Sequence, residues 1–199
     1  MLGLSVAAGL LITEVISGGA GCPQGTVQVV MSPDATAMTV LYDAFHLNVK
    51  DANSVAIMDC EVRVKFEKPA ATNFGIESAD FRGFVSLEPG LVALQKVHVR
   101  SGSTREERLA SAEFAEERWI GPVNEEFILT THRPSGVEMV GCHPTREKTR
   151  VVIRSRIRIN SRRSGGRGQL TVDSVDGRVA QKFNLKWQSC PARLINKNR

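Results

Sequence analysis

The sequence predicts an all-β protein, a single antiparallel β-sandwich braced by disulfide bonds. Charged and apolar residues alternate with a period of two in Cys60–Phe66 and again in Arg150–Ile159, which is typical of strands with one buried face. About ten short extended segments of this kind are separated by turn residues, a spacing typical of sandwiches. The four cysteines are an even number, as paired disulfides require.

Length and composition indicate one folded domain. The chain has 199 residues, of which 42% are hydrophobic and 24% charged, enough for one sizeable core but short for two. No internal repeat or linker divides it, so we expect a single domain over residues 21–195 and a polar tail at 196–199. The formal net charge of +5 permits weak attraction to polyanions and demands none.

The first residues have the features of an export signal. Residues 2–16 form an apolar segment that ends in the small residues 17–21, as in signal peptides with a short apolar core. We therefore predict that residues 1–20 are cleaved, although no Lys or Arg precedes the core and Glu14 lies near its end; a buried N-terminal helix is the alternative. A spanning helix needs about 20 apolar residues, so no stable membrane span is expected after cleavage. The protein is then secreted and extracellular, or periplasmic or cell-surface in a bacterium.

In an exported chain the cysteines indicate two disulfides, for which four cysteines allow three connectivities. We predict the sequential pairs Cys22 with Cys60 and Cys142 with Cys190, which would brace each half of the domain. The gaps between the cysteines are too wide for a zinc site, and we expect neither a metal nor a cofactor. A lipid-modified Cys22 is a minor alternative.

Extended segments follow one another through the first half of the chain. They are Thr26–Met31, Thr36–Val49, Cys60–Phe66, Ala79–Leu87 and Leu91–Arg100. The pattern in Cys60–Phe66 predicts that Val62 and Val64 face the core and that Arg63 faces solvent. Glu88–Gly90 predicts a type II turn before the last of these segments, with glycine at the position of positive φ.

Residues 103–119 are ambiguous. Ser103 stands three residues before Glu106, a capping-box pattern, and the following residues favour helix. Ala110 and Phe114, however, fall on one side of an alternating pattern that favours a strand. The residues by themselves leave helix and strand both open.

The second half of the chain continues with extended segments after a break at Gly121–Pro122. They are Glu126–His132, Val137–Cys142, Arg150–Ile159, Gln169–Ser174 and Arg178–Trp187. Asp176–Gly177 lies between the last two and predicts a β-hairpin turn.

Several segments together resemble a known family. They are Gly21–Val27, Cys60–Val62 with the strand after it, Asp80–Phe84, Gly121–Pro122, Cys142, Leu170–Gly177 and Leu185–Cys190. The chain thus resembles secreted proteins of fungi and some bacteria that share domain of unknown function 4360. The resemblance implies export, two disulfides and a β fold, and favours a strand over residues 109–119. It brings no activity and no catalytic residue, and this chain is richer in Arg and Glu than the fungal members.

An arginine-rich segment is the strongest candidate for a binding surface. The candidate polyanion-binding residues are Arg154, Arg156, Arg158, Arg162 and Arg163. The first three alternate along one predicted strand and would project from one face, where they could bind phosphate, a sulfated glycan or another polyanion. Nucleic acid is not expected, because no aromatic residues are interleaved for base stacking. The alternative is a solvated strand face that pairs with glutamates such as Glu113 and Glu116.

Sequence patterns for catalysis are weak. The acids available for acid–base work are Asp43, Asp59, Asp80, Asp173 and Asp176, and the histidines are His46, His98, His132 and His143. Nothing in the sequence pairs these acids or histidines, and no nucleophile-elbow motif is present. Among aromatic residues, Trp187 and Phe183 are predicted to be core, while Trp119 and Tyr42 could be exposed and bind a glycan.

The sequence therefore predicts a secreted or cell-envelope protein that is a non-catalytic structural or binding module. A polyanion- or glycan-binding module that uses the arginine face is the alternative. A hydrolase is the less favoured third reading.

Overall fold

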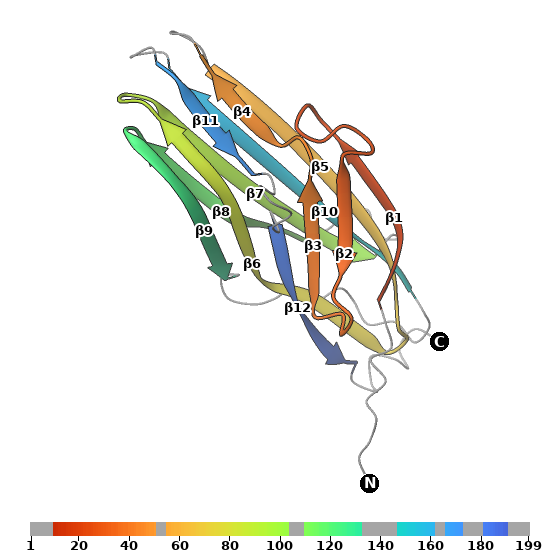
Figure 1. Cartoon of the computed structure of the whole chain (residues 1–199). Coiled ribbons are helices and arrows are strands. Elements are labelled where there is room, and N and C mark those ends of the chain that lie inside the picture. The colour runs from red at the N-terminus through yellow and green to blue at the C-terminus, as the bar shows by residue number, and fades with distance from the viewer. Residues whose placement is uncertain are drawn as a thin grey trace.

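The computed structural model describes residues 10–50, 55–103, 110–132, 147–161, 166–172 and 181–190. These residues form two antiparallel sheets that pack face to face as a sandwich, and they include no helix (Figure 1). The predicted all-β sandwich is confirmed.

A five-stranded sheet forms one layer. Its order is β1 (Leu11–Gly18), β5 (Val55–Lys68), β10 (Glu147–Asn160), β7 (Val92–Ser103) and β8 (Ala110–Ile120). The two predicted alternating strands, β5 and β10, are neighbours at its centre and pair along their full lengths.

A seven-stranded sheet forms the other layer. Its order is β2 (Val27–Met31), β3 (Ala37–Tyr42), β12 (Gln181–Ser189), β6 (Thr72–Leu87), β11 (Gly168–Thr171) and β4 (His46–Val49), and β9 (Val123–His132) also pairs with β6. The 16-residue strand β6 is therefore the template on which β9, β11 and β12 all pair.

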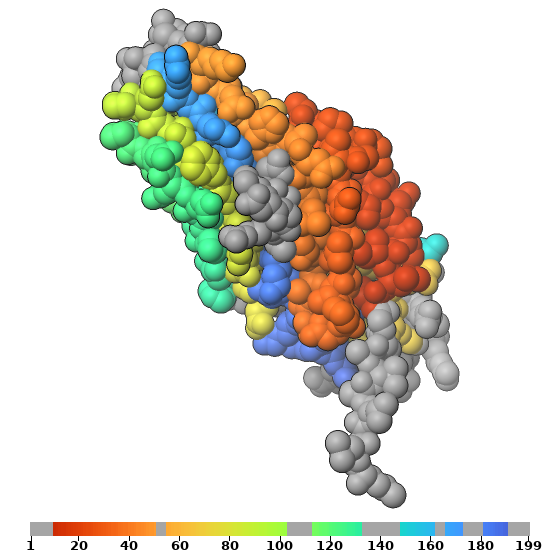
Figure 2. Space-filling view, viewed as in Figure 1, coloured from red at the N-terminus to blue at the C-terminus, as the bar shows by residue number. Residues whose placement is uncertain are grey.

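The prediction that the strands on either side of Asp176–Gly177 pair with each other as a hairpin is wrong. β11 and β12 do not pair with each other: Thr171 pairs with Phe84, and Gln181 pairs with Phe81. Because β9 occupies one edge of β6, β11 and β12 follow one another along the other edge, and Figure 2 shows the two blue segments there. The long strand β6 thus offers both segments a partner, while the predicted turn itself lies outside the described residues.

The turn at Glu88–Gly90 connects the two layers. Gly90 has φ of 81°, as predicted, and the strands before and after it, β6 and β7, belong to different sheets. The stretch from Cys60 to Arg100 therefore crosses the sandwich twice, through β5, β6 and β7.

The alternating strands place their apolar side chains in the core, as predicted. Val62, Val64 and Phe66 on β5 are at most 1% exposed, and Arg63 between them is exposed. Such burial is the main favourable term in folding.

A buried polar chain links the two layers. The Tyr42 hydroxyl donates to Oε1 of Gln181 at 2.8 Å, and Nε2 of Gln181 donates to Oγ of Ser155 at 3.0 Å. Burial raises the pKa of Tyr42 above its usual value. Tyr42 and Gln181 belong to the seven-stranded sheet and Ser155 to the five-stranded sheet.

The ambiguous segment is a strand where it is described. β8 (Ala110–Ile120) pairs with β7 and buries Phe114, as the family resemblance implied. Tertiary pairing has overridden the local helix propensity, which is a weak preference. Residues 104–109 and the predicted strand Val137–Cys142 lie outside the described residues.

The disulfide Cys22–Cys60 is confirmed, with a sequence separation of 38 residues. Cys190 is also disulfide-bonded, and its predicted partner Cys142 lies outside the described residues. The first bond joins the loop after β1 to the centre of β5 and anchors the N-terminal edge of the sandwich.

Strand β1 covers the edge of β5. Seven of its residues pair with β5, and the Thr13 hydroxyl donates to the Lys65 carbonyl at 3.2 Å. This segment is a strand rather than the N-terminal helix that was the alternative to an export signal. Cleavage after residue 20 stays a prediction, and it would remove this edge strand.

We predict that a chain beginning at Gly21 is about 2–3 kcal/mol less stable than one beginning at Leu10, because Ile12 and Val15 pack against the core. Urea unfolding of the two chains measures the difference. The open edge of β5 should also promote association through strand pairing, which size-exclusion chromatography detects. Equal stability and a monomeric shorter chain would show that β1 is dispensable.

Candidate binding surface on the five-stranded sheet

The outer face of the five-stranded sheet carries rows of charged residues that run across the strands. The register places Glu61 on β5 opposite Arg154 on β10, and Asp59 opposite Arg156. Directly opposed residues on one face have Cβ atoms about 4.5–5.5 Å apart. The acidic side chains of β5 therefore lie next to the arginine side chains of β10 in the regular strand register.

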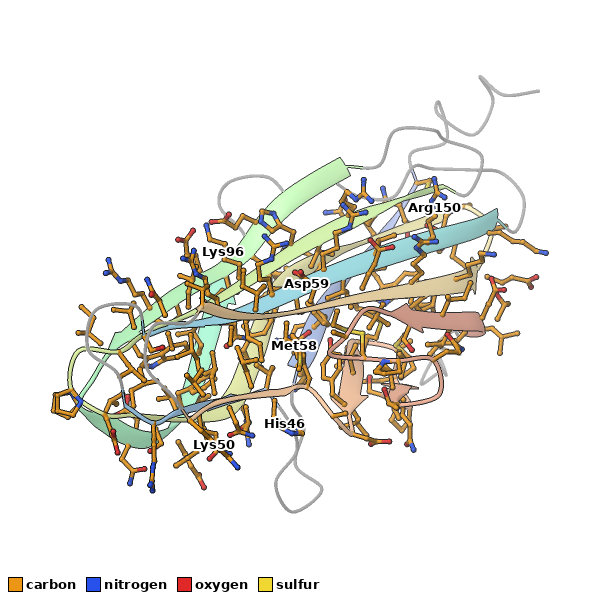
Figure 3. The ribbon with its side chains drawn as sticks, turned by 90° about the horizontal axis from the view of Figure 1, so that it is seen from above. His46, Lys50, Met58, Asp59, Lys96 and Arg150 are labelled. Carbon is orange, nitrogen blue, oxygen red and sulfur yellow. A yellow bond between two sulfur atoms is a disulfide. The ribbon has the colours of Figure 1, made fainter. Side chains whose placement is uncertain are left out.

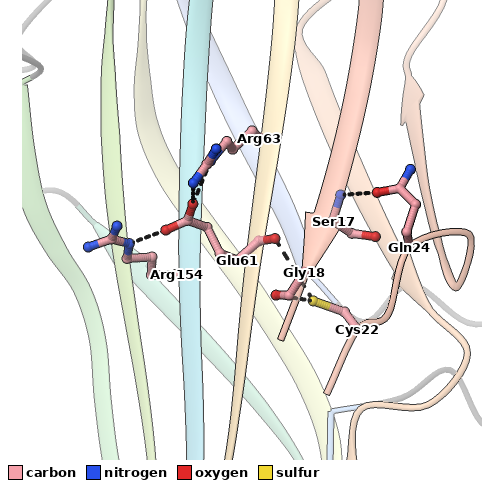
Figure 4. Close-up of polar contacts among 7 residues, drawn as sticks. All are labelled: Ser17, Gly18, Cys22, Gln24, Glu61, Arg63 and Arg154. Atoms are coloured by element: carbon pink, nitrogen blue, oxygen red, sulfur yellow. Dashed lines mark hydrogen bonds and ion pairs between the residues drawn. The ribbon is translucent and has the colours of Figure 1, made fainter. Parts of the chain in front are cut away.

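Glu61 accepts hydrogen bonds from two arginines (Figure 4). Its Oε2 bonds Nε of Arg154, and its Oε1 lies 2.5 Å from Nε of Arg63. Partial burial by itself would raise the pKa of Glu61, but the bonds from Arg154 and Arg63 outweigh it and hold this pKa below its usual value. Glu61 is thus an ionised acceptor at neutral pH.

Asp59 forms a two-bond pair with the Arg156 guanidinium. Nε of Arg156 lies 2.6 Å from Oδ1, and a terminal guanidinium nitrogen lies 3.2 Å from Oδ2. These bonds to Asp59 raise the pKa of Arg156, and such bidentate pairs have a defined geometry.

The strands β7 and β8 add a second set of pairs to the same face. The ammonium group of Lys96 lies 2.5 Å from Oε2 of Glu116, and Nε2 of His98 lies 3.4 Å from Oε2 of Glu113. The hydrogen bond from Lys96 to Glu116 raises the pKa of Lys96.

A hollow of about 480 Å³ lies across this face, and we call it the charged groove. It is lined by Gly18, Gly19, Asp59, Cys60, Glu61, Lys96, His98, Arg154, Ser155 and Arg156. Figure 3 shows Asp59 and Lys96 on this side of the sandwich, and His46 on the opposite side. Its volume is within the usual range of ligand pockets, about 300–1,000 Å³.

The predicted arginine strip is only partly brought together. Arg154 and Arg156 line the groove, and Arg158 lies on the same strand and is half-buried. Arg162 and Arg163 lie outside the described residues. The arginines pair with Asp59 and Glu61 of β5, whereas the glutamates that we expected as partners include Glu113 and Glu116, which pair with β7.

Sequence reasoning missed Lys96, His98 and the two acids of β5 as members of this surface. Lys96 and His98 are two residues apart in the predicted segment Leu91–Arg100, so the strand pattern places them on one face. Glu61 lies in the predicted segment Cys60–Phe66, and Asp59 stands directly before that segment. The signal that was lacking is the order of the strands, which brings the two pairs to either side of β10.

The two aromatic residues that could have been exposed and bound a glycan are both buried. Tyr42 is 0% exposed and Trp119 is 8% exposed, and the Trp119 ring packs against Phe127 at a centroid distance of 4.6 Å. Phe183 is buried, as predicted. Trp187 is partly buried and donates from Nε1 to the Ala35 carbonyl at 2.8 Å.

Among the remaining candidate acids and histidines, those that the structure describes do not line the charged groove. Asp173, Asp176 and His143 lie outside the described residues. Asp80 accepts a hydrogen bond from Thr130 at 2.9 Å on the other sheet. In the described segments, no group of three or more His, Cys, Asp or Glu side chains is placed to hold a metal ion. The same segments contain no helix of the length and apolarity that a membrane span needs.

Comparison of the sequence with known proteins gives two matches. The family described as domain of unknown function DUF4360 matches residues 8–190. A protein of Arthroderma benhamiae named "Uncharacterized secreted protein" is 30% identical over 186 residues, which are 90% of this chain and 71% of that protein. The family match includes the whole of β1.

Comparison with solved structures gives only distant likeness. TmCBM61 in complex with β-1,4-galactotriose has 12% identity and a TM-score of 0.29, with 90% of each chain covered. Tailspike protein 4 of bacteriophage CBA120 has 9% identity and a TM-score of 0.28, over 89% of this chain and 20% of that one. Scores this low carry no argument about the ligand.

Proposed function

The chain belongs to the family of domain of unknown function 4360, and from this premise we propose that it is a secreted, non-catalytic binding module. The A. benhamiae relative is named as secreted, which supports the same location for this chain. The disulfide Cys22–Cys60 supports it independently, because disulfides form and persist in oxidising compartments outside the cytosol.

The ligand that we propose is a hydroxyl-rich saccharide, held in the charged groove. The observation that carries this proposal is that cations on the neighbouring strands β10 and β7 are paired with acids on the strands that flank them. The pairs include Glu61–Arg154, Asp59–Arg156 and Lys96–Glu116. Neighbouring sugar hydroxyls can donate to a carboxylate and accept from a guanidinium at the same time. Because the paired charges largely cancel, the groove attracts a neutral polar ligand at least as well as a polyanion.

The state of the two acids supports binding rather than hydrolysis. Glycoside hydrolysis needs one carboxyl group with a raised pKa to act as the acid, and a second carboxylate facing it. Glu61 has a lowered pKa, and Asp59 is engaged by Arg156 through two bonds. Both acids serve better as hydrogen-bond acceptors than as proton donors.

The test is a glycan array followed by isothermal titration calorimetry. We predict that Arg156→Gln weakens saccharide affinity about tenfold or more, since a hydrogen bond to a charged group contributes about 1.5–3 kcal/mol. Arg118→Gln is the matched control, because Arg118 is an exposed arginine of the same sheet that does not line the groove. The affinity of the wild type for an uncharged saccharide should change little with salt.

Two results would contradict this proposal. One is an array with no saccharide bound. The other is retention on heparin without binding of any uncharged saccharide, if that retention falls steeply with salt and is lost when Arg154, Arg156 and Arg158 become Glu, which would favour the polyanion alternative.

A further inference from the structure

A cluster of arginines surrounds one valine on the outer face of the five-stranded sheet, next to the charged groove. Val152 lies on β10, directly opposite Arg63 on β5 and Arg100 on β7. Arg150 and Arg154 flank it two residues away on β10 itself, and so lie on the same face. We call the four arginines, Arg63, Arg100, Arg150 and Arg154, the arginine cluster.

The side chains of the cluster can reach a common point above Val152. Neighbouring strands lie about 4.8 Å apart, so Arg63 and Arg100 start about 10 Å apart on either side of β10. Val152 is only 4% exposed although it faces outward, which is the result expected when long arginine stems lie over an apolar side chain. The guanidinium groups of Arg63 and Arg154 are both held at Glu61, and Arg100 and Arg150 start within side-chain reach of them.

Two arginines of the cluster share a single acid. Glu61 is shared between Arg63 and Arg154, and the neighbouring cation Lys65 has its own partner in Glu14. In the charged groove, by contrast, Arg156 and Lys96 each have an acid of their own.

Arg100 adds an unsatisfied donor to this positive charge. Its Nε is buried and has no hydrogen-bond acceptor among the described residues. A buried donor without an acceptor is costly, because it has lost its bond to water without replacing it. An oxygen of a bound anion would supply the missing acceptor.

We propose that the arginine cluster binds a tetrahedral oxyanion, a sulfate or phosphate monoester, carried by the saccharide in the groove. The planar guanidinium offers paired donors that match such oxygens. Arg154 belongs to the cluster and also lines the groove, and its partner Glu61 lines the groove as well. One ligand can therefore occupy the groove and reach the cluster. The inference rests on the proposed function for the saccharide, whereas the anion site stands on the cluster itself.

The first test is titration with inorganic sulfate, and separately with phosphate, at constant ionic strength, followed by the arginine Nε–H signals in NMR. The wild type should show a saturable shift of the Arg100 signal. Arg100→Gln should weaken binding at least tenfold, as seen in the remaining cluster signals, while Arg118→Gln leaves it unchanged. Arg100→Lys keeps the positive charge but lacks the paired donors of the guanidinium, so this variant should bind the anion with intermediate affinity.

The second test compares one oligosaccharide with and without a sulfate ester, and with and without a phosphate ester. An ester should raise the affinity of the wild type about tenfold and leave that of Arg100→Gln unchanged. If no saccharide binds but sulfate or phosphate still does, the proposed function fails and the anion site stands. If the ester adds no affinity, or if neither anion gives a saturable shift, the anion inference is overturned.

Discussion

Replacing Cys22 and Cys60 together by alanine is expected to lower the free energy of unfolding by about 3–4 kcal/mol. The bond closes a loop with a sequence separation of 38 residues, and on the chain-entropy model its loss restores about that much freedom to the unfolded chain. Cys22 and Cys60 are 0% and 2% exposed, so the bond also holds the loop after β1 against the core.

Urea unfolding of the double variant and of the wild type, both non-reduced, measures this effect. The single variant Cys22→Ala is the control, since it breaks the same bond and should lose a similar amount. A loss below about 1 kcal/mol in the double variant would mean that the edge formed by β1 and β5 is held by strand pairing and packing, and that the entropy argument does not apply here.

Truncating Phe183 to alanine is expected to cost about 3–5 kcal/mol, the usual range for a fully buried aromatic residue. Phe183 is 0% exposed. Its ring meets those of Phe81 on β6 and Phe114 on β8 edge-on, with centroids 6.1 and 6.4 Å away. Because β6 and β8 belong to opposite layers, the cavity would open where the two sheets meet.

Equilibrium denaturation of Phe183→Ala measures this cost. Phe183→Leu keeps most of the volume and should lose clearly less than the alanine variant. Ile128→Ala, at a side chain that is 65% exposed, should change stability by less than about 0.5 kcal/mol. A small loss for Phe183→Ala would show that the layers close over the cavity.

Much of the fold could be predicted from local patterns. The alternation in Cys60–Phe66 and Arg150–Ile159 places Val62 and Ile153 inside and Arg63 outside, because successive side chains of a strand point to opposite faces. The glycine of Glu88–Gly90 has positive φ, as a type II turn requires.

The errors arose where distant parts of the chain compete for the same partner. Asp176–Gly177 is a favourable hairpin signal, but β6 pairs with both flanking strands, β11 and β12. In residues 110–119 the local preference for helix is outweighed by strand pairing with β7. A local pattern carries no information about which edge a strand will pair with.

The candidate site shows the same division. The arginines of β10 could be recognised in the sequence as a strip along one strand face. The net charge of the surface around them, however, depends on Asp59 and Glu61, which β5 places opposite them. The arginine cluster needs Arg63 and Arg100 from two further strands. Neither neighbour could be known before the strand order was known.

The sequence by itself determined that this protein is a β domain and which side chains of its alternating strands face inward, because period-two alternation carries that information without long-range contacts. It predicted the pair Cys22–Cys60 as one of three possible connectivities, and the structure confirms that pair. Only the tertiary structure decided which strands are neighbours and in which register, because these depend on pairings between residues far apart in the chain. Those pairings make a charge-balanced groove of one part of the outer face, and a positively charged cluster around Val152 of the next.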